Sequence, residues 1–191
     1  VEATVTDASG NSSSCISNVT VEDNLARVLT CPNNIIINLD PGLCGQVVDY
    51  IVEATDNCGN PSLSIVSGPA SGTYLDYHDS SWTVDAEAND GNGNTSSCSF
   101  TIEMFAYANP TEVLTCNDNV QISIDPQGSG VLGADMMLEG GPYGCYDDYI
   151  VTIDGASNEL NCTMVGEGTI MVMVEDPDTG NTCWGSIVVE D

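Results

Sequence analysis

The chain has 191 residues, and its 29 Asp and Glu residues against a single Arg and no Lys give a formal net charge of -28. A charge of this size and sign excludes an electrostatic grip on nucleic acid or on anionic lipid. The sequence holds no run of about eighteen apolar residues, no signal peptide and no lipidation motif, so we expect no direct membrane insertion.

The nine cysteines form no C-x-x-C pattern and accompany a single His, which favours disulfides over a zinc site. Disulfides form in oxidising surroundings, so the sequence predicts a secreted or extracellular protein, at the cell surface or in an extracellular filament. The lone His78 lies in a polar loop, and Arg27 is the only basic residue besides it. We therefore expect no enzyme, because general-base and oxyanion-stabilising groups are missing.

The chain begins with a hairpin that it repeats later. Val1–Cys15 and Val84–Cys98 are identical at eight of fifteen positions, and both carry a turn rich in Gly and Asn. Segments 27–42 and 112–127 match at eight of sixteen positions, with an offset of 85 residues. This period predicts a tandem array. The expected parts are 1–24, a closing hairpin of a preceding repeat with a linker, then 25–106 and 107–191, one β-sandwich each.

Short runs of alternating apolar and polar residues, bounded by turn residues, predict strands in both units. In the first unit we expect strands at 35–37, 46–54 and 63–66, a loop with one short edge strand at 67–81, and a hairpin at 84–104. In the second we expect strands at 120–124, 131–138, 149–153, 169–175 and 184–189, with one helical turn within 134–139. About seven short strands per unit predict an all-β fold of tandem immunoglobulin-like β-sandwiches stapled by disulfides.

Three motifs of the first unit belong together: Cys31-Pro32, Ala54-Thr55-Asp56-Asn57-Cys58-Gly59, and Asp90-x-x-Gly93-Asn94-x-x-x-Cys98-x-Phe100. They resemble the hyalin repeat (HYR) module, an immunoglobulin-like extracellular domain of animal adhesion proteins and long bacterial surface proteins. The resemblance implies adhesion or cell-surface architecture and no catalytic activity. The second unit departs from the pattern, with Asn117 in place of the proline, and is similar to segments that accompany these repeats in secreted proteins of the Bacteroidota.

Family members with only two cysteines resemble this chain at Cys31 and Cys98, which implies a bridge between these two and leaves Cys44 with Cys58. A straight strand over residues 45–57 would hold the ends of the second pair roughly 40 Å apart, against the roughly 5.5 Å of a disulfide. Either the chain doubles back there, or the pairs are Cys31 with Cys58 and Cys44 with Cys98.

For the second unit we expect the pairs Cys116 with Cys183 and Cys145 with Cys162. Cys15 is then left over. Its partner belongs either to a preceding repeat or to another molecule, in an intermolecular bond.

Acids gather where three segments of an immunoglobulin-like unit meet: the linker before it, the loop after its second strand and the loop of its closing hairpin. Oxygen ligands at such a junction resemble the arrangement by which cadherins bind Ca²⁺ and stiffen, so Ca²⁺ is the one expected cofactor. The candidate ligands are Glu22, Asp23, Asn24, Asp56, Asp90 and Asn92. The second unit offers Glu112, Asp147, Asp148, Asp176 and Asp178. The alternative is that these residues only form turns on an acidic surface.

These features predict a structural or adhesive repeat protein, a stalk or filament of stacked β-sandwiches stiffened by calcium. The hairpin in residues 1–21 is suited to add strands to an exposed sheet edge, so copies of the chain or neighbouring repeats are the expected partners. The alternative is a carbohydrate-binding module of a secreted multidomain protein. In that case Tyr143, Tyr146, Tyr149 and Trp184 would bind surface glycans.

Overall fold

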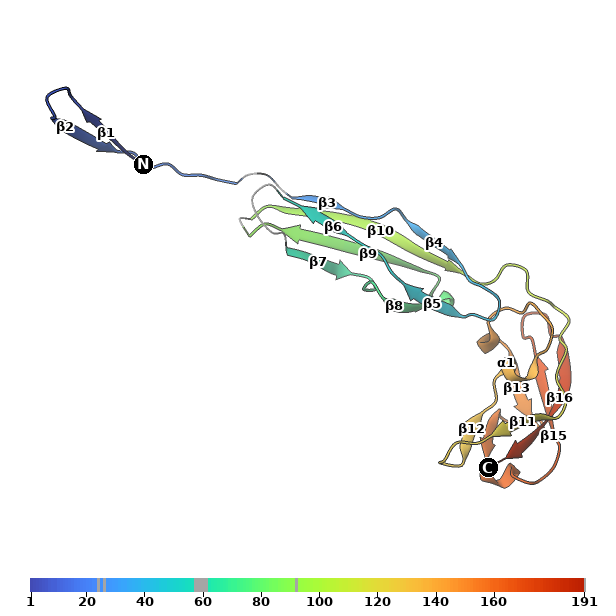
Figure 1. Ribbon diagram of the computed structural model, residues 1–191. Coiled ribbons are helices and arrows are strands. Elements are labelled where there is room, and N and C mark those ends of the chain that lie inside the picture. The colour runs from blue at the N-terminus through green and yellow to red at the C-terminus, as the bar shows by residue number, and fades with distance from the viewer. Residues whose placement is uncertain (24, 26, 57–61, 92, 191) are drawn as a thin grey trace.

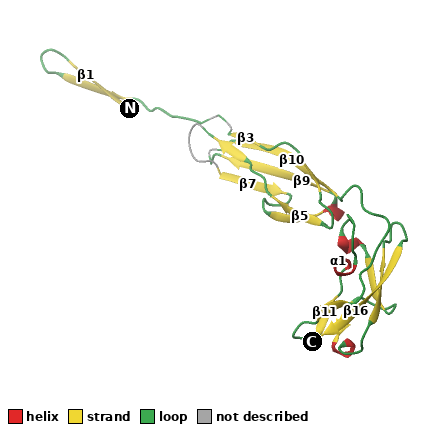
Figure 2. Cartoon of the chain, turned by 45° about the vertical axis from the view of Figure 1, so that its right-hand side comes forward, coloured by secondary structure: helices red, strands yellow, loops and turns green. Residues whose placement is uncertain are grey.

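The computed structural model describes residues 1–191 except 24, 26, 57–61, 92 and 191. It consists of a β-hairpin followed by two β-sandwiches, which Figure 1 shows in chain order. Helical structure in the described residues is confined to short turns (Figure 2). No helix in this part of the chain is long and apolar enough to cross a membrane.

The hairpin pairs β1 (Glu2–Thr6) with β2 (Ser12–Ile16), and Ala3 lies opposite Cys15. Asp7 closes its turn, because its carboxylate accepts hydrogen bonds from the backbone and the side-chain amide of Asn11. The Asn11 amide holds the pKa of Asp7 below its ordinary value. All residues of both strands are exposed. A two-stranded hairpin has no core of its own, so its apolar side chains remain available for contact.

The first sandwich has a four-stranded sheet of order β4-β10-β9-β7. These strands are β4 (Ile35–Asn38), β10 (Thr95–Phe105), β9 (Ser81–Asn89) and β7 (Ser62–Ser67). Two ribbons complete it, β3 (Val28–Thr30) with β6 (Glu53–Thr55) and β5 (Gly45–Val48) with β8 (Thr73–Asp76). The pairing of β4 with β10 is parallel and the other pairings are antiparallel.

The core of the first sandwich lies between this sheet and the β5–β8 ribbon. Successive side chains of a strand face opposite sides, so alternate apolar residues of β9 and β10 point inward. Val84, Phe100 and Ile102 are buried from the sheet side, and Val48 and Leu75 are buried from the ribbon side. The alternation seen in the sequence is therefore the pattern of burial.

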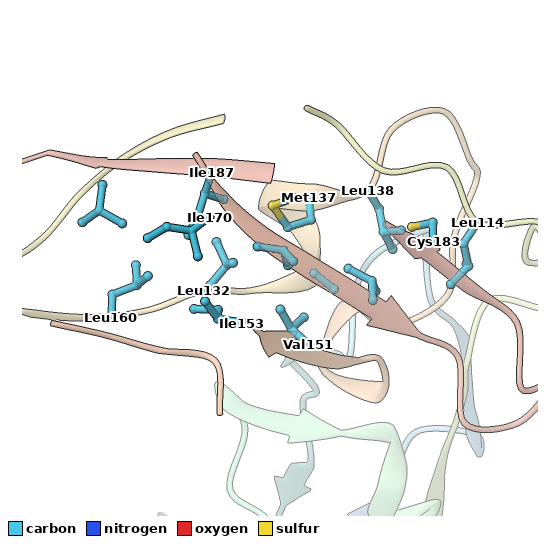
Figure 3. Close-up of a cluster of buried hydrophobic side chains, with 14 of the residues drawn as sticks. Leu114, Leu132, Met137, Leu138, Val151, Ile153, Leu160, Ile170, Cys183 and Ile187 are labelled. Carbon is cyan, nitrogen blue, oxygen red and sulfur yellow. The ribbon is translucent and has the colours of Figure 1, made fainter. Parts of the chain in front are cut away.

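The second sandwich has the same sheet order, β11-β16-β15-β13. Its strands are β11 (Val120–Ser123), β16 (Thr182–Glu190), β15 (Ile170–Glu175) and β13 (Ile150–Ile153), with a ribbon of β12 (Ser129–Val131) and β14 (Glu159–Asn161). Ile35 pairs in parallel with Ile102, and Val120 pairs in parallel with Ile187. Both partners differ by 85 positions (120 minus 35, 187 minus 102), so the register is the same. Figure 3 shows its larger core, in which Leu132, Met137 and Ile187 meet.

Two expected strands are wrong in detail. The strand expected at 46–54 is two strands, β5 and β6, because the backbone N–H of Tyr50 donates to the Ser71 hydroxyl instead of to a strand partner. The strand expected at 131–138 ends at Val131 and continues as α1 (Ala134–Met137). Ala134 and Met137 are both buried, which is the spacing of one helical turn, and the helical turn expected within 134–139 is confirmed.

Candidate functional site

Three disulfides order the described part of the chain. Cys31 joins Cys98 and Cys116 joins Cys183, each across 67 positions and within one sandwich. The first is the pairing that the resemblance to the HYR module implies, and the alternative pairs Cys31 with Cys58 and Cys44 with Cys98 are wrong. The second is the pairing expected for the second unit. The third bond joins Cys44 of the first sandwich to Cys145 of the second, with their Cα atoms 4.7 Å apart. The site with the most specific chemistry is therefore the junction between the two sandwiches.

The expected pairing of Cys145 with Cys162 is wrong. Cys145 is buried beside the first sandwich, just before the turn η2 (Tyr146–Asp148). Cys162 begins another turn, η3 (Cys162–Met164), and is an exposed free thiol, as is Cys15. The expected pairing of Cys44 with Cys58 is also wrong, because Cys44 bonds to Cys145; Cys58 itself lies outside the described residues.

The sequence does carry a signal for the junction disulfide. With the offset of 85 residues, Cys31 and Cys98 correspond to Cys116 and Cys183, but Cys44 corresponds to Ser129. A cysteine without a counterpart cannot belong to the bond that both sandwiches share. It is thus a candidate for a bond that leaves its own unit.

The backbone also crosses the junction beside the disulfide. The N–H of Gly42 donates to the carbonyl of Tyr143 at 3.1 Å, and Gly42 forms a parallel bridge with Cys145. Gly42 has a φ of 80°, and a Cβ atom there would lie 2.5 Å from Cε2 of Tyr146. Only glycine fits this position, because the conformation disfavours side chains and the Tyr146 ring fills the space. The two sandwiches are in direct contact, without a spacer.

Polar side chains of the turn η1 (Tyr77–Asp79) bind the second sandwich. The Tyr77 hydroxyl donates to Oδ2 of Asp148 at 2.5 Å, and Nε2 of His78 lies 2.7 Å from Oδ1 of the same carboxylate. The other ring nitrogen of His78, Nδ1, lies 2.5 Å from Oδ1 of Asp76. A protonated imidazole donates to both carboxylates, which no neutral tautomer can do.

The electrostatics of this group favour the charged His78. Hydrogen bonds to Asp76 and Asp148 raise the pKa of His78 above its ordinary value, although the ring is half exposed. The backbone N–H of His78 lowers the pKa of Asp76. Burial and the hydrogen bond to Asp148 raise the pKa of Tyr77, so its hydroxyl keeps its proton and remains a donor. The contact is thus a charge-assisted one.

An acidic cavity of about 280 Å³ opens at the same junction. Among the residues that line it are Tyr77 and the linker residues Tyr107 and Pro110. Four of the five acids predicted for the second unit also line it: Glu112, Asp148, Asp176 and Asp178. Asp147, the fifth, lies instead beside the Cys44–Cys145 bond. The predicted gathering of acids at this end is confirmed, with the first sandwich closing one side of it.

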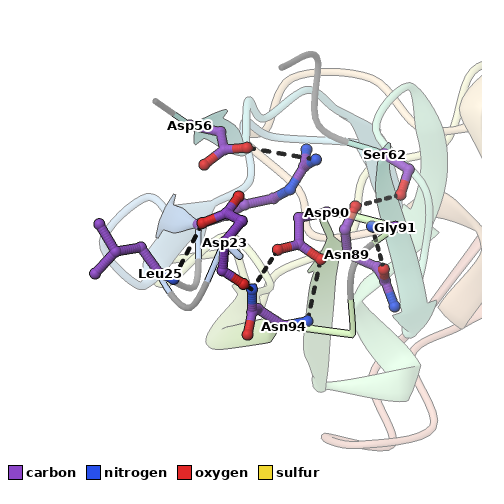
Figure 4. A network of polar contacts seen from close by, with 9 residues as sticks. Asp23, Leu25, Asp56, Ser62, Asn89, Asp90, Gly91 and Asn94 are labelled. Atoms are coloured by element: carbon purple, nitrogen blue, oxygen red, sulfur yellow. Dashed lines mark hydrogen bonds and ion pairs between the residues drawn. The ribbon is translucent and has the colours of Figure 1, made fainter. Parts of the chain in front are cut away.

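One of the acids predicted as ligands at the first unit, Asp56, forms an ion pair with a cation of the protein itself (Figure 4). The guanidinium of Arg27 lies 3.6 Å from Oδ2 of Asp56, and both side chains are at most 3% exposed. Oδ2 of Asp23 is buried without a hydrogen-bond partner among the described residues. Among the described residues, the sets of three ligand atoms within 4.8 Å all lie at the junction instead. Arg27 thus supplies a positive charge where the sequence predicts Ca²⁺.

Asp90, another predicted ligand, binds Asn94, and Asn94 in turn binds the linker. The backbone and side-chain amide of Asn94 donate to the two carboxylate oxygens of Asp90, and the amide also donates to the carbonyl of Asp23 (Figure 4). In the second sandwich the Asn181 amide donates to the carbonyl of Glu112 in the same way. Glu22 is exposed, and Asn24 and Asn92 lie outside the described residues.

The tyrosines considered for glycan binding do not form one exposed face. Tyr143 is 1% exposed, and its hydroxyl donates to the carbonyl of Glu139. The rings of Tyr146 and Tyr149 lie 6.5 and 6.2 Å from Tyr143, partly buried against the same core. Trp184 is exposed, on β16. The tyrosines serve packing and the junction.

Two solved structures illustrate the comparison by fold. The protocadherin gammaB7 EC3-6 cis-dimer has a TM-score of 0.36 and 11% identity, over 95% of this chain and 56% of that chain. Human mucin-like protocadherin EC1-2 has a TM-score of 0.32 and 10% identity, over 85% of this chain and 97% of that chain.

Two comparisons by sequence found a match. Hyalin from Strongylocentrotus purpuratus is 32% identical over 119 residues, which are 60% of this chain and 10% of Hyalin. The chain thus spans about a tenth of the length of that relative. The family model described as the HYR domain matches residues 23–104. The match to the HYR family therefore falls on the first sandwich.

Proposed function

We propose that this chain is a rigid section of an extracellular stalk or filament with a structural or adhesive role, and that it catalyses no reaction. The observation that carries the proposal is the bond between Cys44 and Cys145. The linker after β10 already joins the two sandwiches, and this bond joins them a second time. Two covalent connections, with Asp148 held by Tyr77 and His78 between them, remove the hinge that a single linker would leave.

A rigid junction suits a mechanical role better than a binding role. Domains joined by one linker move relative to each other by default, unless their interface is large or tied. Here a bond that only an oxidising environment preserves ties the junction, which agrees with an extracellular location. A stalk transmits force and holds its distal end at a distance, and both tasks need this stiffness.

The partners we propose are copies of the chain or neighbouring repeats. Val5 and Ile16 of the hairpin are exposed on a two-stranded element without a core. The strand β7 forms one edge of the first sheet and is exposed along its whole length. An exposed edge and a free hairpin are the two parts that strand addition requires.

Calcium remains part of the proposal as a second stiffening element. At the junction, an ion held by Glu112, Asp148, Asp176 and Asp178 would reduce the repulsion among acids that come from different loops. At the first unit, Arg27 already neutralises part of the charge. Melting in Ca²⁺ and in chelator separates the two: Asp178→Asn would abolish a calcium response at the junction, and Asp23→Asn one at the first unit.

The test of the proposed function is the relative motion of the two sandwiches, measured by residual dipolar couplings. A rigid junction gives both sandwiches one common alignment tensor. We expect the double variant Cys44→Ser, Cys145→Ser to give two tensors of different magnitude, with each sandwich still folded around its own disulfide. Cys162→Ser, which removes a thiol that forms no bond in the described chain, is the matched control and should keep one tensor. Two unequal tensors in the unaltered chain would contradict the proposal.

Glycan binding is the competing function. It predicts that Trp184→Ala removes binding on a glycan array, because Trp184 is the one exposed aromatic of the four considered. The mechanical proposal predicts no glycan signal with either the unaltered chain or this variant.

A further inference from the structure

The end of the second sandwich that points away from the first is built like the end of the first sandwich that forms the junction. Each has an Asp-Pro turn, at Asp40 and at Asp125. In each turn the carbonyl of the Asp accepts a backbone hydrogen bond from the third residue after it, Leu43 in one case and Gly128 in the other. The turn leads into a ribbon, β5–β8 or β12–β14, and Figure 1 shows β12 at the far end of the second sandwich.

The turns that follow the two ribbons also correspond. Asp76 caps η1 by accepting from the backbone N–H of His78, and Asn161 caps η3 by accepting from the backbone N–H of Thr163. Each turn closes with a hydrogen bond to its own first residue, Tyr77 or Cys162. Cys162 therefore stands where Tyr77 stands in the first sandwich.

In the first sandwich this position belongs to the junction. The backbone N–H of Tyr77 donates to the carbonyl of Cys44 at 2.9 Å, so the turn is adjacent to the cysteine that bonds to the next sandwich. In the second sandwich, the counterpart of Cys44 is Ser129, and the thiol is on the turn instead. Sγ of Cys162 lies 3.5 Å from the carbonyl of Gly128, the residue before Ser129. The cysteine thus lies at the start of the ribbon in the first sandwich and on the turn after the ribbon in the second, at corresponding ends of the two sandwiches.

The surface beside Cys162 is open. A depression of about 630 Å³ is lined by residues of the turn and the ribbon, including Asp125, Ser129 and Val131. The Val131 side chain is 64% exposed, although it lies on the ribbon of the sandwich. At the corresponding end of the first sandwich, the loop that carries Cys145 packs on Gly42 and bonds to Cys44.

We propose that this end of the second sandwich docks a further β-sandwich, and that Cys162 forms a disulfide with a cysteine in the loop by which that module enters the contact. The partner would dock on the second sandwich as the second sandwich docks on the first. It would carry a cysteine at the position that corresponds to Cys145. This inference rests on the proposed stacking of modules and adds a second linkage site to it.

The bond forms by oxidation of two thiols. Each sulfur loses its proton, and together they give up two electrons as the S–S bond forms. A small-molecule or protein disulfide of an oxidising compartment accepts these electrons by thiol–disulfide exchange and leaves as two thiols. Exposure of Cys162 permits this exchange.

Disulfide mapping of the full-length protein tests the proposal. The protein is isolated without reductant, its free thiols are alkylated, and peptides are produced with pepsin at acidic pH, because a chain with one Arg and no Lys offers trypsin almost no cleavage sites. We expect the peptide that contains Cys162 to be bonded to a cysteine peptide from a module outside residues 1–191. An alkylated Cys162, or a bond from Cys162 to a small thiol or to any cysteine of residues 1–191, would overturn the proposal.

A variant gives an independent readout on the same protein. Cys162→Ser should release the partner thiol, which then becomes alkylated, while Cys15→Ser should leave that thiol protected. The outcome does not depend on the junction between the two sandwiches. If the junction between the two sandwiches proved flexible but Cys162 were bonded as expected, only the proposed function would fail.

Discussion

His78 of the first sandwich and Asp148 of the second lie 2.7 Å apart, between ring nitrogen Nε2 and carboxylate oxygen Oδ1, although 70 positions separate them in the sequence. The contact lies beside the Cys44–Cys145 bond. The Tyr77 hydroxyl donates to the other oxygen of the same Asp148 carboxylate. The only imidazole of the chain is thus used to hold two domains together. A residue that the sequence places in a solvated loop gains its role only from the second sandwich.

The raised pKa of His78 predicts a junction that weakens as the pH rises. The ordinary pKa is 6.5, and the folded value is higher because His78 hydrogen-bonds to Asp76 and Asp148. A raised folded pKa contributes stability that is complete below the unfolded value and is lost as the pH rises through the folded value. Proton NMR can follow this directly, because the chain has one His.

We expect the His78 ring signals to titrate above pH 6.5 in the unaltered chain and closer to 6.5 in Asp148→Asn. Asp147→Asn is the matched control, since it removes the neighbouring charge but not the hydrogen bond to the ring. If the His78 ring signals titrated at the same pH in Asp148→Asn as in the unaltered chain, the two sandwiches would not meet here in solution.

Gly42 predicts a specific steric requirement at the junction. Gly42→Ala should lower the free energy of unfolding by about 1 kcal/mol from its left-handed conformation alone, and further because the new Cβ would lie 2.5 Å from the Tyr146 ring. Gly72→Ala is the control, with a φ of 83° and only one atom within 4 Å of the new Cβ, at 3.7 Å. Urea denaturation should therefore show a larger loss of unfolding free energy for Gly42→Ala than for Gly72→Ala. In a chain that also carries Tyr146→Ala, the two losses should be equal. Equal losses in the two glycine variants would mean that Tyr146 is not packed on Gly42.

The fold follows from the sequence to the extent that its determinants are local. Alternate apolar residues such as Val84 and Phe100 specify which face of each strand is buried. The bridge between Cys31 and Cys98 was implied by the resemblance to the HYR module and is confirmed. The break between β5 and β6 does not follow from the local sequence, because its cause, the hydrogen bond from Tyr50 to Ser71, joins positions 21 apart. The junction disulfide does not follow from the pattern of a single unit either, because a unit taken by itself offers Cys145 only Cys162 as a partner.

The candidate calcium site of the first unit shows a second limit of the sequence, which predicts where the acids gather but not which group balances their charge. The sequence places Asp23, Asp56 and Asp90 at one end of the sandwich, but their charge does not reveal what balances it. Arg27 lies four positions from Asp23, directly before β3, and only the structure shows its side chain buried beside Asp56. Calcium binding stays a prediction.

Arg27 itself predicts a large effect. Arg27→Gln would leave the buried Asp56 carboxylate without its cation and should destabilise the first sandwich by about 3 kcal/mol, a typical loss when one partner of a buried ion pair is removed. The double variant Arg27→Gln, Asp56→Asn should recover most of that loss, which urea denaturation can measure. If Ca²⁺ binds this end as well, added Ca²⁺ should stabilise Arg27→Gln more than the unaltered chain. Unchanged stability of Arg27→Gln would contradict the buried pair.

The two disulfides within the sandwiches predict equal contributions. Each closes a loop of 67 positions, from a cysteine just before the first strand of the four-stranded sheet (β4 or β11) to one on its last strand (β10 or β16). Loop closure of this length restricts the unfolded chain and stabilises the fold by about 4 kcal/mol. Cys31→Ser with Cys98→Ser should therefore lower the unfolding free energy of the first sandwich by as much as Cys116→Ser with Cys183→Ser lowers that of the second. Because the second sandwich has the larger core, we expect it to stay folded after the loss while the first unfolds at physiological temperature. Circular dichroism melting of the two double variants measures this difference, and the reverse order of melting would show that the disulfides, not the cores, set the relative stability.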